Sequence, residues 1–134
     1  MGACCMSDSR QRRLAATLAA YHIPLVAAWG LYSVALFGSM LVPGDSVPDL
    51  GFFGWDKLAH VLAFLGLALL TASAFTSHRR VLLLVAVWGL LFGVSTELAQ
   101  SFAPGRIPSV GDAISNLAGT FAGVLMSWRF LLPK

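Results

Sequence analysis

The stretch ELAQSFAPGRIPSVGDAISN, residues 97–116, decides the fold of this chain because it joins two long apolar runs by a short connection. Its Pro104-Gly105 pair is typical of a turn. The runs on either side, residues 81–103 and 109–133, each have about the roughly 20 residues that an α-helix needs to cross a bilayer. Because so short a loop makes consecutive helices antiparallel neighbours, the stretch predicts a helical hairpin in a membrane.

The composition indicates a membrane protein rather than a soluble domain. Of the 134 residues, 57% are hydrophobic and 11% are charged, whereas soluble domains carry about 25% charged residues. The charges lie in clusters, with long apolar runs between them. We therefore predict an all-α, integral membrane four-helix bundle at residues 14–134, preceded by a cytoplasmic tail at residues 1–13. The helices are expected at about residues 14–42, 56–76, 81–103 and 109–133.

The distribution of lysine and arginine predicts the orientation. Seven of the nine basic residues fall in segments that would share one side of the membrane, namely Arg10, Arg12, Arg13, Arg79, Arg80, Arg129 and Lys134. The positive-inside rule then puts both termini in the cytoplasm. The net charge of +3 reflects this anchoring, and no basic patch is interleaved with aromatic residues, so no nucleic-acid partner is expected.

Small and polar residues form a stripe on each of the last two predicted helices. Steps of three or four residues place each stripe on one helix face. The stripes are Gly89, Gly93, Glu97 and Gln100 on one helix, and Asp112, Asn116, Gly119 and Gly123 on the other. Paired small residues let helix backbones approach closely in lipid, so the polar groups are expected to face the bundle interior. Ser109 is the expected N-cap of the last helix, with Asp112 as its capping partner.

A third set of polar groups begins the second helix, where Asp56 and His60 are spaced i,i+4 and so share a face. From the rise of an α-helix, Glu97 and Asn116 each lie roughly 10 Å from their helix ends, at one level. Three helices are therefore expected to bring polar side chains to one pocket that opens on the extracytoplasmic side. Inserting one charged residue at membrane depth costs roughly 2.5–3.5 kcal/mol of free energy. A cluster of such residues is therefore hard to explain as chance.

Two kinds of pairing are expected in this pocket. Arg106 or Lys57 would supply a cation, and Asp112 or Glu97 would supply its carboxylate. His60 would pair with a carboxylate as well. No metal-ligand spacing such as His-Glu-x-x-His occurs, so no metal or other cofactor is expected. The kind of metal site to test would be a divalent ion held by carboxylates.

These motifs resemble the VanZ-like family of small bacterial membrane proteins. The resemblance covers about residues 55–123 and rests on the segments DKLAHVLAFLGLALL, ELAQSFAPGR and SVGDAISNLAGTFAG. The family pattern is Asp-Lys-x-x-His, then Glu-x-x-Gln, then Arg, Asp and Asn around the last hairpin; the matching residues are Asp56, Lys57, His60, Glu97, Gln100, Arg106, Asp112 and Asn116. The resemblance implies a multi-pass protein of the bacterial cytoplasmic (inner) membrane with a role at the cell envelope, linked to glycopeptide resistance of the teicoplanin type. It supplies no reaction.

One hypothesis is a site that binds or acts on a lipid-linked or cell-wall molecule. The catalytic groups would be His60, whose imidazole can take up and release a proton, and the carboxylates of Glu97 and Asp112, which suit a general acid or base. The substrate-binding groups would be Asp56, Lys57, Gln100, Arg106 and Asn116. No serine lies in a recognisable nucleophile motif, so water would have to attack, and whether the chain is an enzyme stays open.

The alternative hypothesis is a non-catalytic membrane scaffold, or a lipid- or antibiotic-binding protein, whose polar network is structural. Buried polar groups usually satisfy one another, which favours this interpretation equally. A transporter is not favoured, because the polar groups occupy only one end of the helices and no inverted repeat is evident. The expected partner is a membrane lipid or lipid-linked envelope molecule, and the glycine-rich faces would also allow a homodimer.

Overall fold

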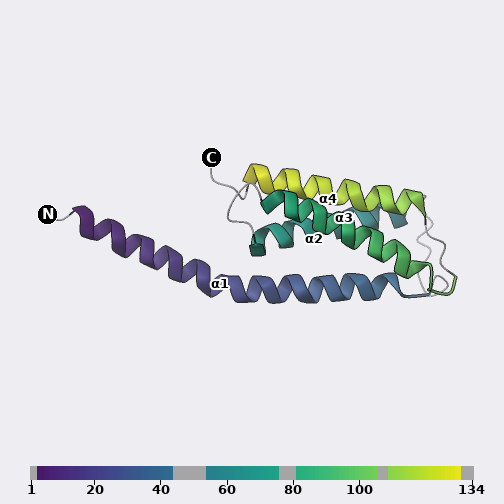
Figure 1. Cartoon of the computed structure of the whole chain (residues 1–134), viewed down its shortest axis with the longest axis horizontal. Helices are drawn as coiled ribbons and strands as arrows, with labels where there is room; N and C mark the ends of the chain where they lie inside the picture. The colour runs from purple at the N-terminus through teal and green to yellow at the C-terminus, as the bar shows by residue number, and fades with distance from the viewer. Residues whose placement is uncertain (1–2, 44–53, 76–80, 106–108, 131–134) are drawn as a thin grey trace.

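The structure is a computed structural model that describes residues 3–43, 54–75, 81–105 and 109–130, with side chains from Ala20 onward. These residues form helices α1 (Ala3–Met40), α2 (Trp55–Phe75), α3 (Val81–Gln100) and α4 (Val110–Phe130). The described part of the chain is therefore all-helical, as predicted. Figure 1 shows the four helices side by side, with the N-terminal part of α1 extending beyond the others.

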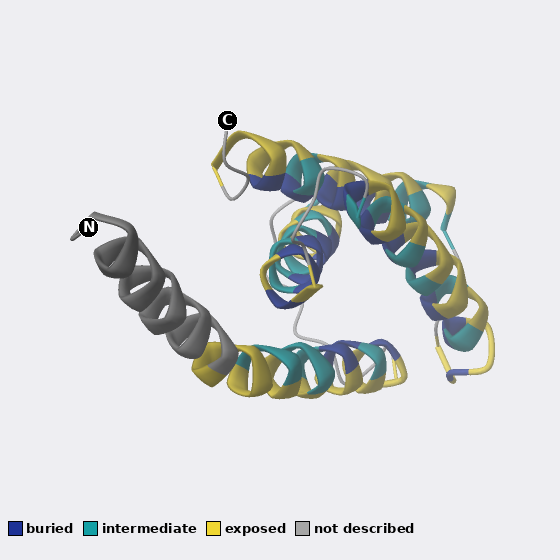
Figure 2. Ribbon diagram, turned by 60° about the vertical axis from the view of Figure 1, so that its left-hand side comes forward, coloured by how far each residue is buried: buried dark blue, intermediate teal, exposed yellow. Residues whose placement is uncertain are grey.

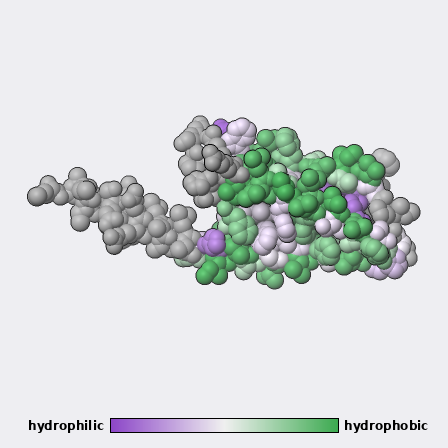
Figure 3. All heavy atoms as spheres, in the orientation of Figure 1, coloured by the Kyte–Doolittle hydropathy of each residue, from purple (hydrophilic) through white to green (hydrophobic). Residues whose placement is uncertain are grey.

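Three of these helices are long and apolar enough to cross a membrane: Ala20–Met40 within α1, Trp55–Phe75 and Val81–Gln100. Their outward faces carry large apolar side chains, such as Leu83 at 71% and Leu84 at 66% exposure. Figure 2 shows the buried residues turned inward, and Figure 3 shows hydrophobic side chains covering most of the described surface in view. So much exposed apolar surface would be untenable in water, so the chain is a helical membrane protein.

The start of the first helix differs from the prediction, and the fourth predicted span is not among the three spans. Helix α1 begins at Ala3 rather than near residue 14, because the polar residues of the expected tail continue the helix instead of stopping it. Helix α4 has the length of a span, but Asp112 in its first turn and Arg129 in its last make it less apolar than the three spans. The fourth span and the cytoplasmic location of both termini stay predictions.

The hairpin between α3 and α4 begins with the predicted turn. After Gln100 the chain forms a turn, in which the backbone N–H of Ala103 donates to the carbonyl of Gln100 at 3.0 Å. Gly105 then adopts a φ of 72°, a left-handed conformation that glycine takes at little cost. The reversal sets α3 antiparallel to α4, so the end of α3 lies beside the start of α4.

The closest contact in the bundle joins α2 and α4, which run parallel. A Cβ atom on Gly119 would overlap the backbone oxygen of Val61. One on Gly123 would lie 3.0 Å from the backbone oxygen of Leu65. The glycines of α4 therefore let its backbone touch that of α2. The sequence predicted α3 and α4 as neighbours, but it did not predict this contact with α2.

The glycines of α3 face α4, as expected for adjacent helices. A Cβ atom on Gly89 would overlap the side chain of Thr120, and one on Gly93 would lie 3.4 Å from the Cβ atom of Asn116. Helix α4 is thus enclosed on two sides, with backbone against backbone at α2 and side chain against backbone at α3. This double contact fixes the rotation of α4 and hence the direction of its polar residues.

Helix α1 packs mainly on α2, through two hydrogen bonds and a small apolar cluster. Trp29 Nε1 donates to Thr71 Oγ1 at 3.0 Å, and Tyr32 donates from its hydroxyl to the carbonyl of Ala63 at 2.9 Å. The cluster comprises Leu36, Met40, Phe64 and Leu67. Both indole and phenol donors are thereby satisfied away from water, which ties α1 to α2.

We predict that Gly119→Ala lowers the free energy of unfolding by about 1–3 kcal/mol, the usual cost of overpacking. The added methyl group meets a backbone oxygen, which cannot rotate away as a side chain could. Denaturant unfolding in detergent micelles, followed by tryptophan fluorescence, measures the change. The matched control is Gly38→Ala, because a Cβ atom there meets nothing within 4 Å. Equal stability of the two variants would contradict the close α2–α4 contact.

Candidate functional site

The predicted site residues gather at one end of the bundle, where α1 and α3 finish and α2 and α4 begin; we call this the polar end (Figure 1). Parallel α2 and α4, with α3 running against them, bring these helix ends together. The described members are Asp56, Lys57 and His60 on α2, Glu97 and Gln100 on α3, and Asp112 and Asn116 on α4. Arg106, predicted to bind an anion here, lies outside the described residues.

A chain of side-chain hydrogen bonds links three helices at the polar end. His60 Nδ1 lies 2.8 Å from Asn116 Oδ1, and Asn116 Nδ2 donates to Glu97 Oε1 at 3.4 Å. Because an amide oxygen can only accept, Nδ1 of His60 carries the hydrogen in this arrangement. His60 and Asn116 are 6% and 2% exposed, so both are held inside the bundle. We expected His60 to pair with a carboxylate, but the Asn116 amide stands between His60 and Glu97.

Asn116 takes this position because of the helix contact beside it. Asn116 precedes Gly119 by one turn, and His60 precedes Val61, whose carbonyl faces Gly119. The close approach of α2 and α4 therefore brings the imidazole and the amide together directly. Glu97, on the antiparallel helix α3, accepts a hydrogen bond from the other end of this amide, Asn116 Nδ2.

The second oxygen of Glu97 takes part in capping α4. Ser109 accepts a hydrogen bond from the backbone N–H of Gly111 at 3.1 Å, as expected of an N-cap. The backbone N–H of Ser109 donates to Glu97 Oε2 at 3.4 Å. In the predicted capping pair Asp112 would have accepted that bond. Because Glu97 comes from the preceding helix, the bond instead joins the end of α3 to the start of α4.

Lys57 lies between two carboxylates at the rim of the polar end. Its Nζ is 2.9 Å from Asp56 Oδ2 and 3.6 Å from Asp112 Oδ1. Its stem lies on Gly111, where a Cβ atom would come within 2.9 Å of Lys57 Cε. Asp112 Oδ1 is buried and accepts no hydrogen bond from the described residues, so the Lys57 ammonium is the group that faces it. The predicted pairing of Lys57 with Asp112 is thus present in the geometry.

Gln100 lies apart from this group. Its Nε2 donates to the sulfur of Met40 at 3.2 Å, which joins the end of α3 to the end of α1. Gln100 is 2% exposed, so its amide is held in this direction. The sequence could not have identified Met40 as its partner, because Met40 is an apolar residue within an apolar run.

A hollow of about 40 Å³ lies beside Asn116, between α3 and α4, and its other lining residues are apolar. The polar pocket that we predicted on the extracytoplasmic side stays a prediction. Among the described residues, no three histidine, cysteine, aspartate or glutamate side chains stand together in a way that could hold a metal ion.

Comparison with known proteins identifies a family. A family model described as VanZ/LLP1 matches residues 6–132, which include most of α1 as well as the segments that carry the resemblance. No curated protein and no solved structure matches the chain. Since the match covers nearly the whole chain, and since the structure is that of an all-helical membrane protein, the chain belongs to the VanZ/LLP1 family.

Proposed function

We propose that the polar end binds the polar head of an envelope lipid, or of a lipid-linked cell-wall molecule, at the outer leaflet of the bacterial cytoplasmic membrane. The observation that carries this proposal is the chain from His60 through Asn116 to Glu97, which joins three helices. Polar and ionisable groups at membrane depth are costly and usually functional. Packing alone would not require them, because apolar residues of similar volume often stabilise a protein as well as buried ionic groups do.

Glu97 is the group best suited to meet a ligand. Both of its described hydrogen bonds are 3.4 Å long, near the upper limit for an N–H···O bond. By contrast, His60 and Asn116 are 2.8 Å apart. A carboxylate held this loosely can accept a shorter bond from a hydroxyl or amide of a ligand, or take up a proton as a general base.

His60 complements Glu97 in this proposal. With its hydrogen on Nδ1, the imidazole has its lone pair on Nε2, so it could accept a proton as well as donate one. Asn116 fixes the ring orientation and couples the histidine to Glu97. Such a pair supports either proton transfer or the recognition of a hydroxyl-bearing head group. The same arrangement of His60, Asn116 and Glu97 would serve either proton transfer or head-group recognition.

Lys57 supplies positive charge for an anionic head group. Its side chain is 48% exposed at the rim, so the ammonium is accessible while it balances Asp56 and Asp112. We propose that Arg106, in the α3–α4 connection, adds a second cation that can hold a phosphate or carboxylate bidentately. A lipid-linked phosphate therefore fits the proposed site in charge. Binding such a molecule at the outer leaflet would connect the family to resistance against teicoplanin-type glycopeptides, which act at that surface.

The second candidate function is a scaffold without catalysis, and the Glu97–Ser109 bond favours it. That bond caps α4 with a carboxylate from α3, so at least part of the polar network holds the hairpin together. A scaffold would need the shape of residue 97 but not its charge. Changing the charge while keeping the shape therefore distinguishes the two functions.

We predict that Glu97→Gln abolishes the function of the protein while the chain still inserts and folds. Glutamine has nearly the same shape, but only one of its two terminal atoms can accept a hydrogen bond, and it cannot act as a base. The measurement is the teicoplanin susceptibility of bacteria that depend on this chain, with the membrane level of each variant checked by immunoblot.

The control for this prediction is Leu98→Ala, because Leu98 follows Glu97 directly and is 63% exposed on the outside of the bundle. We expect that variant to behave like the wild type. If Glu97→Gln protects cells as well as Leu98→Ala does, the carboxylate has no chemical role and the scaffold function is correct.

We also predict that Lys57→Gln weakens the binding of an anionic lipid and leaves the fold intact. The substitution removes the exposed cation at the rim, and a phosphate head loses its counter-charge. Native mass spectrometry with undecaprenyl phosphate measures the bound fraction. The control is Arg129→Gln, which removes a cation from the last turn of α4, at the opposite end of that helix. An equal loss in both variants would show that net charge, rather than the polar end, attracts the lipid.

A further inference from the structure

The amide of Asn116 has a hydrogen-bond acceptor at one end and a donor at the other, so the groups that it meets decide its orientation. Its Nδ2 lies 3.4 Å from Glu97 Oε1, and its Oδ1 lies 2.8 Å from His60 Nδ1. The imidazole of His60 could meet either end, because a neutral ring has a hydrogen on one nitrogen and a lone pair on the other. The orientation of the amide therefore depends on what Glu97 presents.

Glu97 presents two acceptors. Its Oε2 accepts a hydrogen bond from the backbone N–H of Ser109 at 3.4 Å, and a backbone N–H always donates. As an ionised carboxylate, Glu97 has no hydrogen to give to Asn116. If the amide turned over, Oδ1 would face Oε1, and two acceptors would meet where Asn116 is only 2% exposed. The carboxylate thus holds Nδ2 toward α3 and leaves Oδ1 for the imidazole on α2.

The other charged groups of the polar end do not compete for this amide. Lys57 lies between two carboxylates, with its Nζ 2.9 Å from Asp56 and 3.6 Å from Asp112. The last turn of α1 carries no charged residue. Among the residues that the structure describes, Glu97 therefore supplies the only carboxylate that is hydrogen-bonded to Asn116.

The shape of the site accepts the amide in either orientation. A Cβ atom on Gly93 would lie 3.7 Å from Asn116 Nδ2, so the amide rests on α3 at a position without a side chain. Turning the amide over exchanges only its oxygen and its nitrogen, which are nearly the same size. Hydrogen bonding rather than packing therefore decides which end of Asn116 faces His60.

We propose that the charge on Glu97, relayed through the Asn116 amide, decides which nitrogen of His60 carries the hydrogen. With Glu97 ionised, the hydrogen stays on Nδ1 and the lone pair on Nε2. Without that charge the amide can turn over, and its Nδ2 donates to Nδ1. The ring then loses the hydrogen on Nδ1 to water and gains one on Nε2, so the number of ring hydrogens is unchanged. Glu97 and Asn116 are thus positioning residues for His60, in addition to any contact of Glu97 with a ligand.

This assignment narrows the chemistry of the head group, and only in that respect does it rest on the function proposed above. While Glu97 is ionised, its carboxylate and Nε2 of His60 are both hydrogen-bond acceptors. They suit a head group that donates hydrogen bonds, such as one with sugar hydroxyls. A group that only accepts, such as an ester carbonyl, would find no donor at either residue.

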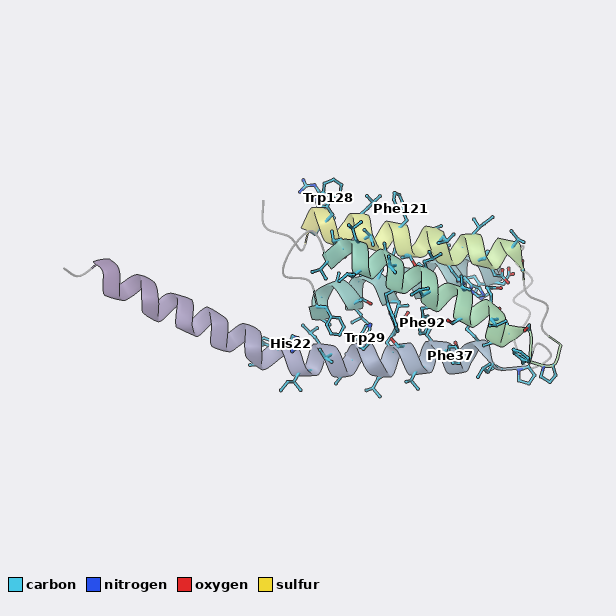
Figure 4. All side chains as sticks on the ribbon, viewed as in Figure 1. His22, Trp29, Phe37, Phe92, Phe121 and Trp128 are labelled. Carbon is cyan, nitrogen blue, oxygen red and sulfur yellow. The ribbon has the colours of Figure 1, made fainter. Side chains whose placement is uncertain are left out.

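The test measures the tautomer of His60 by NMR of the full-length protein in detergent micelles. The imidazole nitrogens are isotope-labelled, and the pH is slightly alkaline, where ordinary imidazoles are neutral. The signal that His60→Gln removes belongs to His60. His22 is exposed about halfway along α1, away from the polar end (Figure 4), and gives a reference signal that the other variants should not change.

The variants separate the charge of residue 97 from its place in the bundle. Glu97→Gln keeps the shape and removes the charge. Adding Asn116→Asp to that variant moves the charge to residue 116, where a carboxylate can only accept, from the His60 ring on one side and from the introduced glutamine on the other. The control is Leu98→Ala, because Leu98 is 63% exposed beside Glu97. Far-UV circular dichroism checks that each variant is folded.

We expect the Nδ1–H tautomer to exceed the Nε2–H tautomer at least about tenfold in the wild type and in Leu98→Ala, because hydrogen bonds to charged groups contribute that much. Glu97→Gln should bring the two tautomers to comparable amounts, since a glutamine amide can face Asn116 with either end. The double variant should restore the wild-type ratio.

The relay is overturned if Glu97→Gln keeps the wild-type ratio, or if the wild type carries hydrogen mainly on Nε2 or on both nitrogens. Should Glu97→Gln fail to fold, Asn116→Ala decides instead. It removes the acceptor of the Nδ1 hydrogen, so the Nε2–H tautomer should increase, and an unchanged ratio would overturn the relay. No ligand enters this measurement, so its failure would be distinct from a failure of the polar end to bind a lipid.

Discussion

The contact on which the rest of the structure depends is that between the backbones of α2 and α4 at Gly119. With no room for a side chain there, the carbonyl of Val61 lies directly against α4. The neighbours of these two residues, His60 and Asn116, are then held 2.8 Å apart inside the bundle. In lipid the driving force for such a contact is packing rather than the hydrophobic effect, so a small residue is what permits it. The polar chain is a consequence of that packing.

Much of this architecture follows from the sequence, because helix periodicity fixes which residues share a face. The apolar runs predicted the helices, and the steps of three and four residues put Glu97 and Asn116 on inward stripes. Periodicity does not fix which neighbour a face meets. It therefore missed that the glycines of α4 face α2, that Asn116 rather than a carboxylate meets His60, and that Gln100 turns to Met40. Those outcomes depend on how each helix is rotated, which only the packing of all four decides.

The polar end combines a rigid part with a part that is less fully bonded. The His60–Asn116 pair is short and buried, whereas the bonds to Glu97 are long and Asp112 Oδ1 accepts no hydrogen bond from the described residues. The charged groups are balanced at the rim, where the Lys57 ammonium lies 2.9 Å from Asp56 and 3.6 Å from Asp112. The buried positions between the helices are instead taken by a neutral amide and an imidazole, which cost less to remove from water than a charge does. The interior pair therefore fixes how the helices meet, and the charges remain near the helix ends.

Helix α1 is held to the bundle in a different way from α4. Trp29 and Tyr32 bond α1 to α2, and the Gln100 amide bonds the sulfur of Met40, the last residue of α1, to the end of α3. Between these bonds α1 meets α3 through aromatic rings such as Phe37 and Phe92. Helix α4 is instead placed by glycines that let its backbone touch α2. The position of α1 therefore depends on directional bonds from large side chains, because indole and phenol donors need partners away from water, whereas the position of α4 depends on the absence of side chains.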